Sequence, residues 1–216
     1  MTTLKDLSLE LTEFHDVPVP QLQRQLLLGL QELCKETWAY VEDLAMTTVA
    51  STAEHTLTPS NASTKVCGVK EATYTDSDSK KHDIPITNRE NMNTESSTWQ
   101  TTTSSDTSIE YIIYDGGTII RLDKIPTAGG LAFTVRVALY PTADITFPGV
   151  LERHTEAVKD FARWKLFALP QAVAPWANPQ LAEYHRQQWV SGMLSLKRKR
   201  GIGYGGARRV RMRWWC

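Results

Sequence analysis

The sequence from residue 148 to residue 196 reads PGVLERHTEAVKDFARWKLFALPQAVAPWANPQLAEYHRQQWVSGMLSL, and this stretch decides the fold class. Its apolar residues recur every three or four positions in two runs, which is the period of a helix with one buried face. The first run consists of Val150, Val158, Phe161, Ala162, Leu166 and Leu169. The second run consists of Ala182, His185, Trp189, Met193 and Leu196. The sequence therefore predicts a pair of helices.

Prolines mark the boundary between the two runs. Pro170 ends the first helix, because the residue before a proline is pushed out of the α region. Asn178 and Pro179 predict the start of the second helix, since Asn is a favoured N-cap and Pro is tolerated at the first helical position. The corner between the helices therefore spans Gln171 to Trp176.

The chain changes character after this pair, and residues 197–216 read KRKRGIGYGGARRVRMRWWC. This tail has eight basic residues and no acidic one, whereas residues 1–196 have 16 basic against 24 acidic residues, a net charge of −8. An acidic body with a basic arm predicts a binding partner for the arm. The alternative, a solubilising tail, would leave two tryptophans in water, although Trp and Arg are enriched at interface hot spots.

We assign two roles within this tail. The predicted docking residues are Arg208, Arg209, Val210, Arg211, Met212, Arg213, Trp214 and Trp215. The predicted hinge residues are Gly201, Gly203, Gly205 and Gly206. These glycines match the spacing of a dinucleotide-binding loop, but neither a preceding strand nor a following acidic residue accompanies them. A hinge is the better interpretation.

The N-terminal part of the chain predicts one long helix. Its apolar positions are Leu22, Leu26, Leu30, Leu33, Cys34, Trp38 and Val41. This rhythm predicts a helix from Pro20 to about Leu44, preceded by a short helix over residues 4–14. Gly29 costs the helix about 1 kcal/mol relative to Ala and indicates a close helix contact.

Residues 47–140 have the character of β-strands. Apolar and polar residues alternate from Phe133 to Tyr140, which predicts a strand with one buried face. The segments 109–114 and 118–122 flank Asp115-Gly116-Gly117 and predict a hairpin. Two further strands, 66–75 and 80–87, are joined by a polar turn. Residues 88–108 are predicted to form a long exposed loop in which Trp99 is the anchor.

Together these elements predict an α+β fold. Residues 1–46 and 148–197 form the helical body, a bundle of one long N-terminal helix and a C-terminal helix pair. Residues 47–147 form an inserted antiparallel β module with the long polar loop 88–108. Residues 198–216 form an extended basic arm.

Several classes of function are excluded by the sequence. Cys34, Cys67 and Cys216 show no paired spacing, so we expect neither a zinc site nor a disulfide framework, and the compartment is predicted to be reducing. No apolar run approaches the roughly 20 residues that span a bilayer, and the N-terminus is not a signal peptide. We predict no catalytic, cofactor-binding or metal site, and no enzymatic activity.

Motifs along the chain carry a resemblance to a known family. They are Leu33-Cys34-Lys35-Glu36-Thr37-Trp38, His55-Thr56-Leu57-Thr58-Pro59, Val137-Ala138-Leu139-Tyr140-Pro141-Thr142, Phe147-Pro148 and Pro175-Trp176-Ala177-Asn178-Pro179. In their order and spacing, from about Pro18 to Leu196, the sequence resembles the head-to-tail adaptor proteins of tailed bacteriophages, also called connector or head-completion proteins.

The resemblance implies a structural protein of the virion neck, assembled in the host cytoplasm. Identical subunits would form a dodecameric ring under the portal protein, and the arm from Arg208 to Trp215 would dock on the portal. A tail or head-closure protein would bind on the other side. DNA would leave through the lumen without being read for sequence, and no membrane would be involved.

Two alternatives remain open from the residues themselves. The basic, aromatic arm is also typical of nucleic-acid binding through phosphate contacts and base stacking. A receptor-binding β module over residues 50–145 on a helical stalk is the other alternative.

Overall fold

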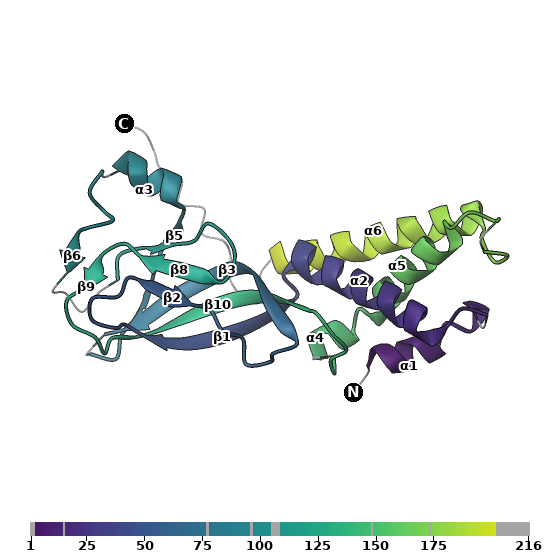
Figure 1. Cartoon of the computed structure of the whole chain (residues 1–216), viewed down its shortest axis with the longest axis horizontal. Helices are drawn as coiled ribbons and strands as arrows, with labels where there is room; N and C mark the ends of the chain where they lie inside the picture. Colours follow the sequence, from purple (N-terminus) through teal and green to yellow (C-terminus); the bar gives the residue numbers. More distant parts are fainter. Residues whose placement is uncertain are drawn as a thin grey trace. The chain divides into compact units, whose positions relative to one another are not determined.

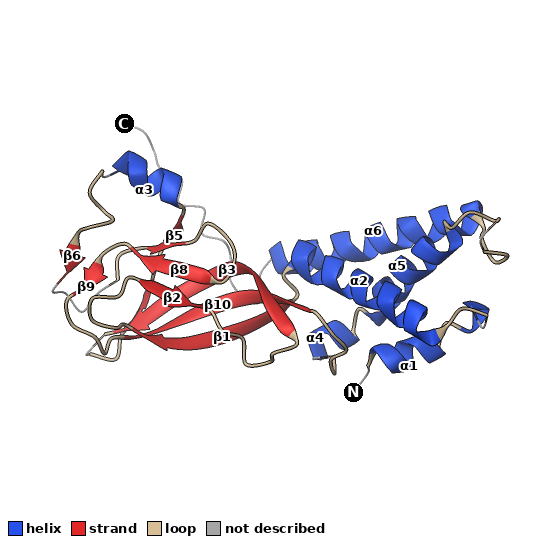
Figure 2. Ribbon diagram, in the orientation of Figure 1, coloured by secondary structure: helices blue, strands red, loops and turns tan. Residues whose placement is uncertain are grey.

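The computed structural model describes residues 3–14, 16–76, 78–95, 97–104, 109–147, 149–172 and 174–201. The chain divides into two compact units, one made of Met1–Ala39 with Asp144–Cys216 and the other of Tyr40–Ala143. The first unit is built from helices and the second mainly from strands (Figures 1 and 2). This segregation confirms the predicted α+β class.

The helical unit contains α1 (Leu4–Leu9), a 3-10 turn η1 (Thr12–Phe14), α2 (Val19–Thr37), α4 (Gly149–Glu152), α5 (Thr155–Phe167) and α6 (Pro179–Gly201). Helix α5 packs against both α2 and α6, and α1 packs on α2 (Figure 1). The predicted apolar faces are the ones that pack. Leu26, Leu30 and Leu33 of α2 are fully buried, and the Trp189 ring of α6 meets the Phe161 ring of α5 edge to face at 5.1 Å between centroids.

Close approach between the helices depends on Gly29, as the sequence predicted. A Cβ atom on Gly29 would lie 2.9 Å from Cδ1 and 3.0 Å from Cβ of Phe161. Helices α5 and α6 meet in a similar way, because a Cβ atom on Gly192 would lie 3.0 Å from Cβ of Ala157. Both glycines therefore set the spacing of the helical unit.

We expect Gly29→Val to lower the free energy of unfolding by about 1–3 kcal/mol, because the added methyl groups overpack the contact with Phe161. Urea denaturation of the full chain measures this change. The neighbouring exposed position supplies the control, since Leu28→Ala should stay within about 0.5 kcal/mol. Equal effects of the two substitutions would contradict the packing of α2 on α5.

The predicted end of the long N-terminal helix is wrong. Helix α2 ends at Thr37, and Trp38 caps it in the left-handed conformation with φ 50° and ψ 41°. The Trp38 N–H donates to the Cys34 carbonyl at 2.8 Å. Residues 40–46, which we predicted to belong to the helical body, form most of strand β1 (Tyr40–Thr47) because they pair with a distant strand.

The C-terminal helix pair is largely as predicted. The Asn178 side chain accepts from the backbone N–H groups of Gln180 and Leu181 at 3.1 and 3.2 Å, which confirms the predicted N-cap of α6. Two boundaries differ from the prediction. The first run is broken at residues 153–154 between α4 and α5, and α6 continues to Gly201, so residues 198–201 are helical. Basic residues at a helix C-terminus favour this extension, because they complement the helix dipole.

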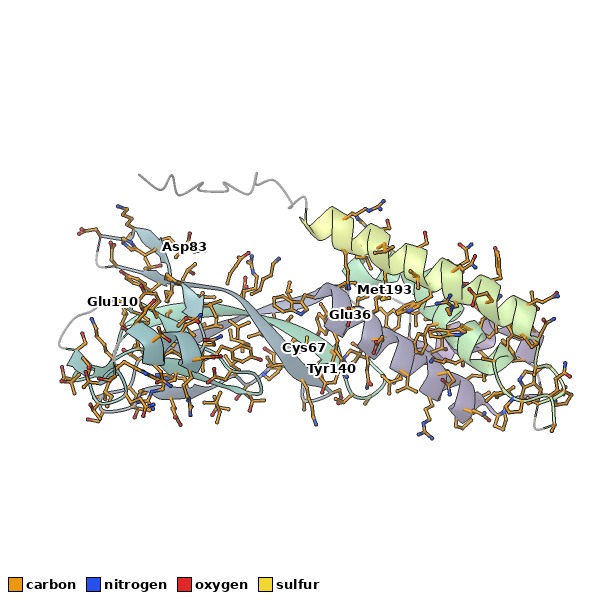
Figure 3. All side chains as sticks on the ribbon, turned by 90° about the horizontal axis from the view of Figure 1, so that it is seen from above. Glu36, Cys67, Asp83, Glu110, Tyr140 and Met193 are labelled. Carbon is orange, nitrogen blue, oxygen red and sulfur yellow. The ribbon has the colours of Figure 1, made fainter. Side chains whose placement is uncertain are left out.

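The β unit contains two four-stranded sheets that share one core. The first has the order β1-β10-β3-β4, and β10 (Ala132–Pro141), β3 (Thr64–Thr75) and β4 (Lys81–Asp83) are all antiparallel to their neighbours. Its long strands β3 and β10 carry Cys67 and Tyr140 (Figure 3). The second has the order β2-β8-β7-β5, with β2 (Glu54–Thr56), β8 (Ile119–Leu122), β7 (Ile112–Ile113) and β5 (Ile86–Thr87).

The shared core confirms the buried face that the alternation of apolar and polar residues predicted for β10. Val135, Val137 and Leu139 of β10 are fully buried and belong to the same cluster as Ile112 and Ile120 of the second sheet. The two sheets therefore pack face to face. The predicted hairpin is also confirmed, since β7 and β8 are antiparallel and the turn glycines Gly116 and Gly117 have positive φ.

Two predictions for the β unit need correction. The predicted strand 80–87 is interrupted at Pro85, so that β4 stays in the first sheet while β5 crosses to the second and pairs in parallel with β7. A short pair, β6 (Thr103–Ser104) and β9 (Ile125–Pro126), is also parallel. The module is thus mixed rather than purely antiparallel.

The polar stretch 88–108 is not one long loop as predicted, because it contains helix α3 (Arg89–Glu95) and strand β6. The predicted anchor Trp99 is confirmed: its side chain is 4% exposed. Its Nε1 donates to Asn93 at 2.8 Å, and the Arg121 guanidinium lies 5.2 Å from its ring centroid. Trp99 thus holds the described part of this segment against the sheet.

Asp123 supplies a pH-dependent prediction. Burial raises the pKa of its carboxyl above the ordinary value, although the Tyr111 N–H donates to it at 3.2 Å. A raised folded-state pKa means that ionisation costs stability, and this cost grows as the pH rises above the unfolded pKa. We expect Asp123→Asn to stabilise the chain at pH 7 and to have a smaller effect at pH 4. A stability difference that does not change with pH, measured by urea denaturation, would contradict this.

Candidate interaction surfaces

The predicted docking arm and most of the predicted hinge lie outside the described residues. This holds for Arg208, Arg209, Val210, Arg211, Met212, Arg213, Trp214 and Trp215, and for Gly203, Gly205 and Gly206. Gly201 is described only as the last residue of α6. The roles of these residues stay predictions.

The described residues contain no group of three or more His, Cys, Asp or Glu side chains arranged to hold a metal ion. Within the same part of the chain, no helix combines the length and apolarity needed to cross a membrane. The surfaces of interest are therefore ones that suit contact with other macromolecules.

The helix that leads into the arm is fixed at its C-terminal end. Lys197 Nζ of α6 donates to the Glu36 carboxylate of α2 at 2.7 Å. Figure 3 shows Glu36 where α2 lies beside α6, the helix that carries Met193. An arm that follows α6 thus starts from a helix that is tied to the rest of its unit.

Helix α6 presents apolar side chains to solvent on the face away from its core. Tyr184 is 54% exposed and Leu194 is 48% exposed, and Leu181 and Val190 are exposed as well. This face, which we call the α6 outer face, is hollowed into a groove of about 510 Å³. The described lining consists of Arg186, Gln187, Val190, Ser191, Leu194, Ser195 and Arg198. Apolar surface rimmed by polar groups is typical of a protein contact site.

The N-terminal segment is held on α5 by ion pairs. Lys159 Nζ lies 2.7 Å from the Glu10 carboxylate and 2.5 Å from that of Glu156, and Arg163 Nε lies 2.5 Å from that of Glu13. Burial on its own would lower the pKa of Lys159, but its hydrogen bonds to Glu10 and Glu156 outweigh burial and raise that pKa. These pairs place α1 and η1 in a defined position on the helical unit.

The β unit has an open side along strands β1 and β2. In the described residues, β1 pairs only with β10, and β2 pairs only with β8. A groove of about 470 Å³ runs there, lined by residues 43–47 of β1 and by His55, Thr56, Thr58 and Ser60. An unpaired strand edge is a template for an extended segment of another chain.

The side chains around this β1–β2 groove are polar and partly acidic. Glu42 accepts from the Ser60 N–H at 3.1 Å, and Arg136 binds both oxygens of Asp43 at 2.6 and 2.8 Å. The hydrogen bond from Arg136 holds the pKa of Asp43 below its usual value, so Asp43 stays ionised. His55 is 9% exposed, burial lowers its pKa, and its Nε2 has no hydrogen-bond partner.

Sequence reasoning predicted the arm, which lies outside the described residues, and missed both surfaces. The signal for the α6 outer face was present, since Tyr184 and Leu194 are apolar residues off the predicted buried face. The β1–β2 groove had no such signal. It forms only when residues 43–47, most of which we assigned to the helical body, become an edge strand.

The family model described as SU10 adaptor protein matches residues 2–213, nearly the whole chain. No curated protein matches the sequence.

Proposed function

Because the chain belongs to the SU10 adaptor protein family, a family of phage head–tail adaptors, we propose that it forms a ring in the virion neck that joins the capsid portal to the tail. The family match over residues 2–213 carries this proposal, and it confirms the resemblance read from the sequence. The role is structural rather than enzymatic.

The helical unit supplies the body of the ring. Its exposed α6 outer face suits contact with a neighbouring protein, and a closed ring of identical subunits repeats each contact many times. Modest individual affinities then add up to a strong joint. We propose twelve copies, with DNA passing through the lumen without being read for sequence.

The arm docks on the portal protein in this proposal. It follows α6, whose C-terminal part contacts the rest of the unit through the buried Leu196 and the ion pair of Lys197 with Glu36. The four arginines and two tryptophans between Arg208 and Trp215 are residue types that dominate interface energetics. Ordering of the segment on docking is offset by burial of the tryptophans.

The β unit contacts the next component of the neck, a tail or head-closure protein. The open edges of β1 and β2 support this assignment, because they can accept an extended segment by backbone hydrogen bonding. The assembled protein would reside in the virion neck after assembly in the host cytoplasm.

Mixing the purified chain with portal-bearing capsids and sedimenting the mixture tests the proposal. We expect the chain to co-sediment at a fixed number of copies per capsid, and not with capsids that lack the portal. A chain that remains in the supernatant with portal-bearing capsids would contradict it.

Nucleic-acid binding is the second candidate, favoured by the eight basic residues of the segment 197–216. It predicts binding to free DNA that weakens steeply with salt. Attachment to portal-bearing capsids that persists after nuclease treatment would instead favour the adaptor.

A further inference from the structure

We propose that neighbouring copies in the ring contact each other head to tail, with the α6 outer face of one copy bound by the α1–η1 segment, residues 4–14, of the next. The inference rests on the proposed function, because it assigns the subunit contact of the proposed ring.

A ring of identical chains needs two different surfaces that fit each other. Head-to-tail contacts close into rings, whereas a contact of one patch with itself gives only a symmetric pair. The helical unit offers two such surfaces on separate helices. Figure 1 shows α1 and α6 on opposite sides of this unit, with α2 and α5 between them. Each copy can therefore bind one neighbour on each side.

The first surface is the α6 outer face. Tyr184, Gln187, Ser191, Leu194 and Arg198 follow one another at helical spacing and are all exposed. They lie opposite the side that buries Trp189 and Leu196 against the unit. The small residues Ser191 and Ser195 line the groove beside Leu194, which leaves room for a protruding side chain from a partner.

The second surface is centred on Leu9 of α1. Leu4 and Leu7 of the same helix are buried, but Leu9 is 65% exposed. The ion pairs of Glu10 with Lys159 and of Glu13 with Arg163 hold the backbone that follows it. On the N-terminal side, the Leu4 N–H donates to the Asp144 carboxylate at 3.0 Å. Leu9 is thus an apolar side chain presented on a fixed support, which is suited to enter a shallow groove.

The charges of the two surfaces are complementary. The α1–η1 segment, residues 4–14, has one basic residue and three acidic ones, a net charge of −2. The described lining of the α6 outer face has Arg186 and Arg198 and no acidic residue. Arg186 donates to Glu183 beside this lining at 2.7 Å, and this hydrogen bond lowers the pKa of Glu183 to about 2. Complementary charge orients two partners and suppresses self-pairing of either patch.

The contact is small, so we expect it to form only where copies are held close together. One apolar side chain in a groove with a charged rim is far below the area of a stable interface. We therefore expect free copies to remain monomeric at micromolar concentration. The portal gathers copies around one axis, and the contact then forms between neighbours at high effective concentration.

Paired substitutions in the full chain test the inference through the number of copies bound per portal-bearing capsid. Leu9→Lys places a positive charge against the basic α6 outer face, and Leu194→Glu places a negative charge against the acidic α1–η1 segment. We expect each single variant to need about tenfold more protein to fill the capsids, because like charges oppose each other in the contact. The double variant, with Leu9→Lys and Leu194→Glu, should bind nearly as well as the unmodified chain.

The control is Leu28→Lys, on the exposed side of α2 and outside both surfaces, which should bind like the unmodified chain. Circular dichroism confirms that the variants fold. If the unmodified chain binds and the single variants bind equally well, or if the double variant is no better than the singles, the proposed contact is overturned while the adaptor function stands. If the unmodified chain fails to bind, the adaptor function itself fails.

Discussion

Deletion of residues 208–216 is expected to abolish attachment to portal-bearing capsids while the rest of the chain stays folded. The two tryptophans alone, at about 2 kcal/mol for each hot-spot residue, predict a loss of about a thousandfold in affinity. Folding should survive, because the deleted residues follow the described cores of both units, in which the last buried residue is Leu196. Co-sedimentation with capsids measures the loss, and circular dichroism checks the fold.

Two matched variants separate charge from shape in the arm. Replacing Arg208, Arg209, Arg211 and Arg213 with lysine keeps the charge, and replacing Trp214 and Trp215 with alanine keeps it as well but removes the aromatic rings. A portal-docking arm requires the rings, so the alanine variant should lose attachment and the lysine variant should retain part of it. Normal attachment of the truncated chain would refute the role of the arm.

Trp189→Ala is expected to destabilise the chain by about 3–5 kcal/mol, the usual range for removing a large buried aromatic side chain. Trp189 is 2% exposed and packs edge to face on Phe161, so the substitution leaves a cavity between α5 and α6. Urea denaturation of the full chain measures the loss. We also expect weaker attachment to capsids, because α6 carries the arm.

The neighbouring residue provides the control for this prediction. Val190 is exposed on the same helix, so Val190→Ala should change the free energy of unfolding by no more than about 0.5 kcal/mol. A loss of similar size from both substitutions would contradict the role of Trp189 packing on α5, since both substitutions raise the helix propensity of α6.

The helices of the C-terminal half were predictable because local signals and packing agree there. Asn178 caps α6, and the apolar faces of α5 and α6 are the ones that become buried. The strand from Phe133 was predictable for the same reason, since its alternation matches the single core of the β unit. Gly29 indicated a close helix contact, but the sequence did not identify its partner, Phe161.

Most of the predictions that failed concern residues that pair with distant parts of the chain. Val41 continues the helical rhythm of α2, but residues 40–47 pair with β10, nearly 100 positions later in the chain. The stretch 88–108 lacks apolar periodicity, so its helix α3 and its strand β6 gave no signal. Ile86 similarly lies in a different sheet from residues 81–83 and pairs in parallel with Ile112.

The candidate surfaces also differ in how far the local sequence predicts them. Composition alone predicts the basic arm, because charge and aromatic content can be read without a fold. The exposure of Leu9 was readable but overlooked, since Leu9 lies off the helical spacing of Leu4, Leu7 and Leu11, which are buried. The β1–β2 groove required the sheet order, which no local pattern encodes.

Imaging of portal-containing virus particles, with this chain marked by a bound antibody fragment, tests the adaptor role most directly. The adaptor role predicts a closed ring of marked subunits on the particle axis, between the portal and the tail. Particles that lack this chain, or that carry it away from the neck, would contradict that role.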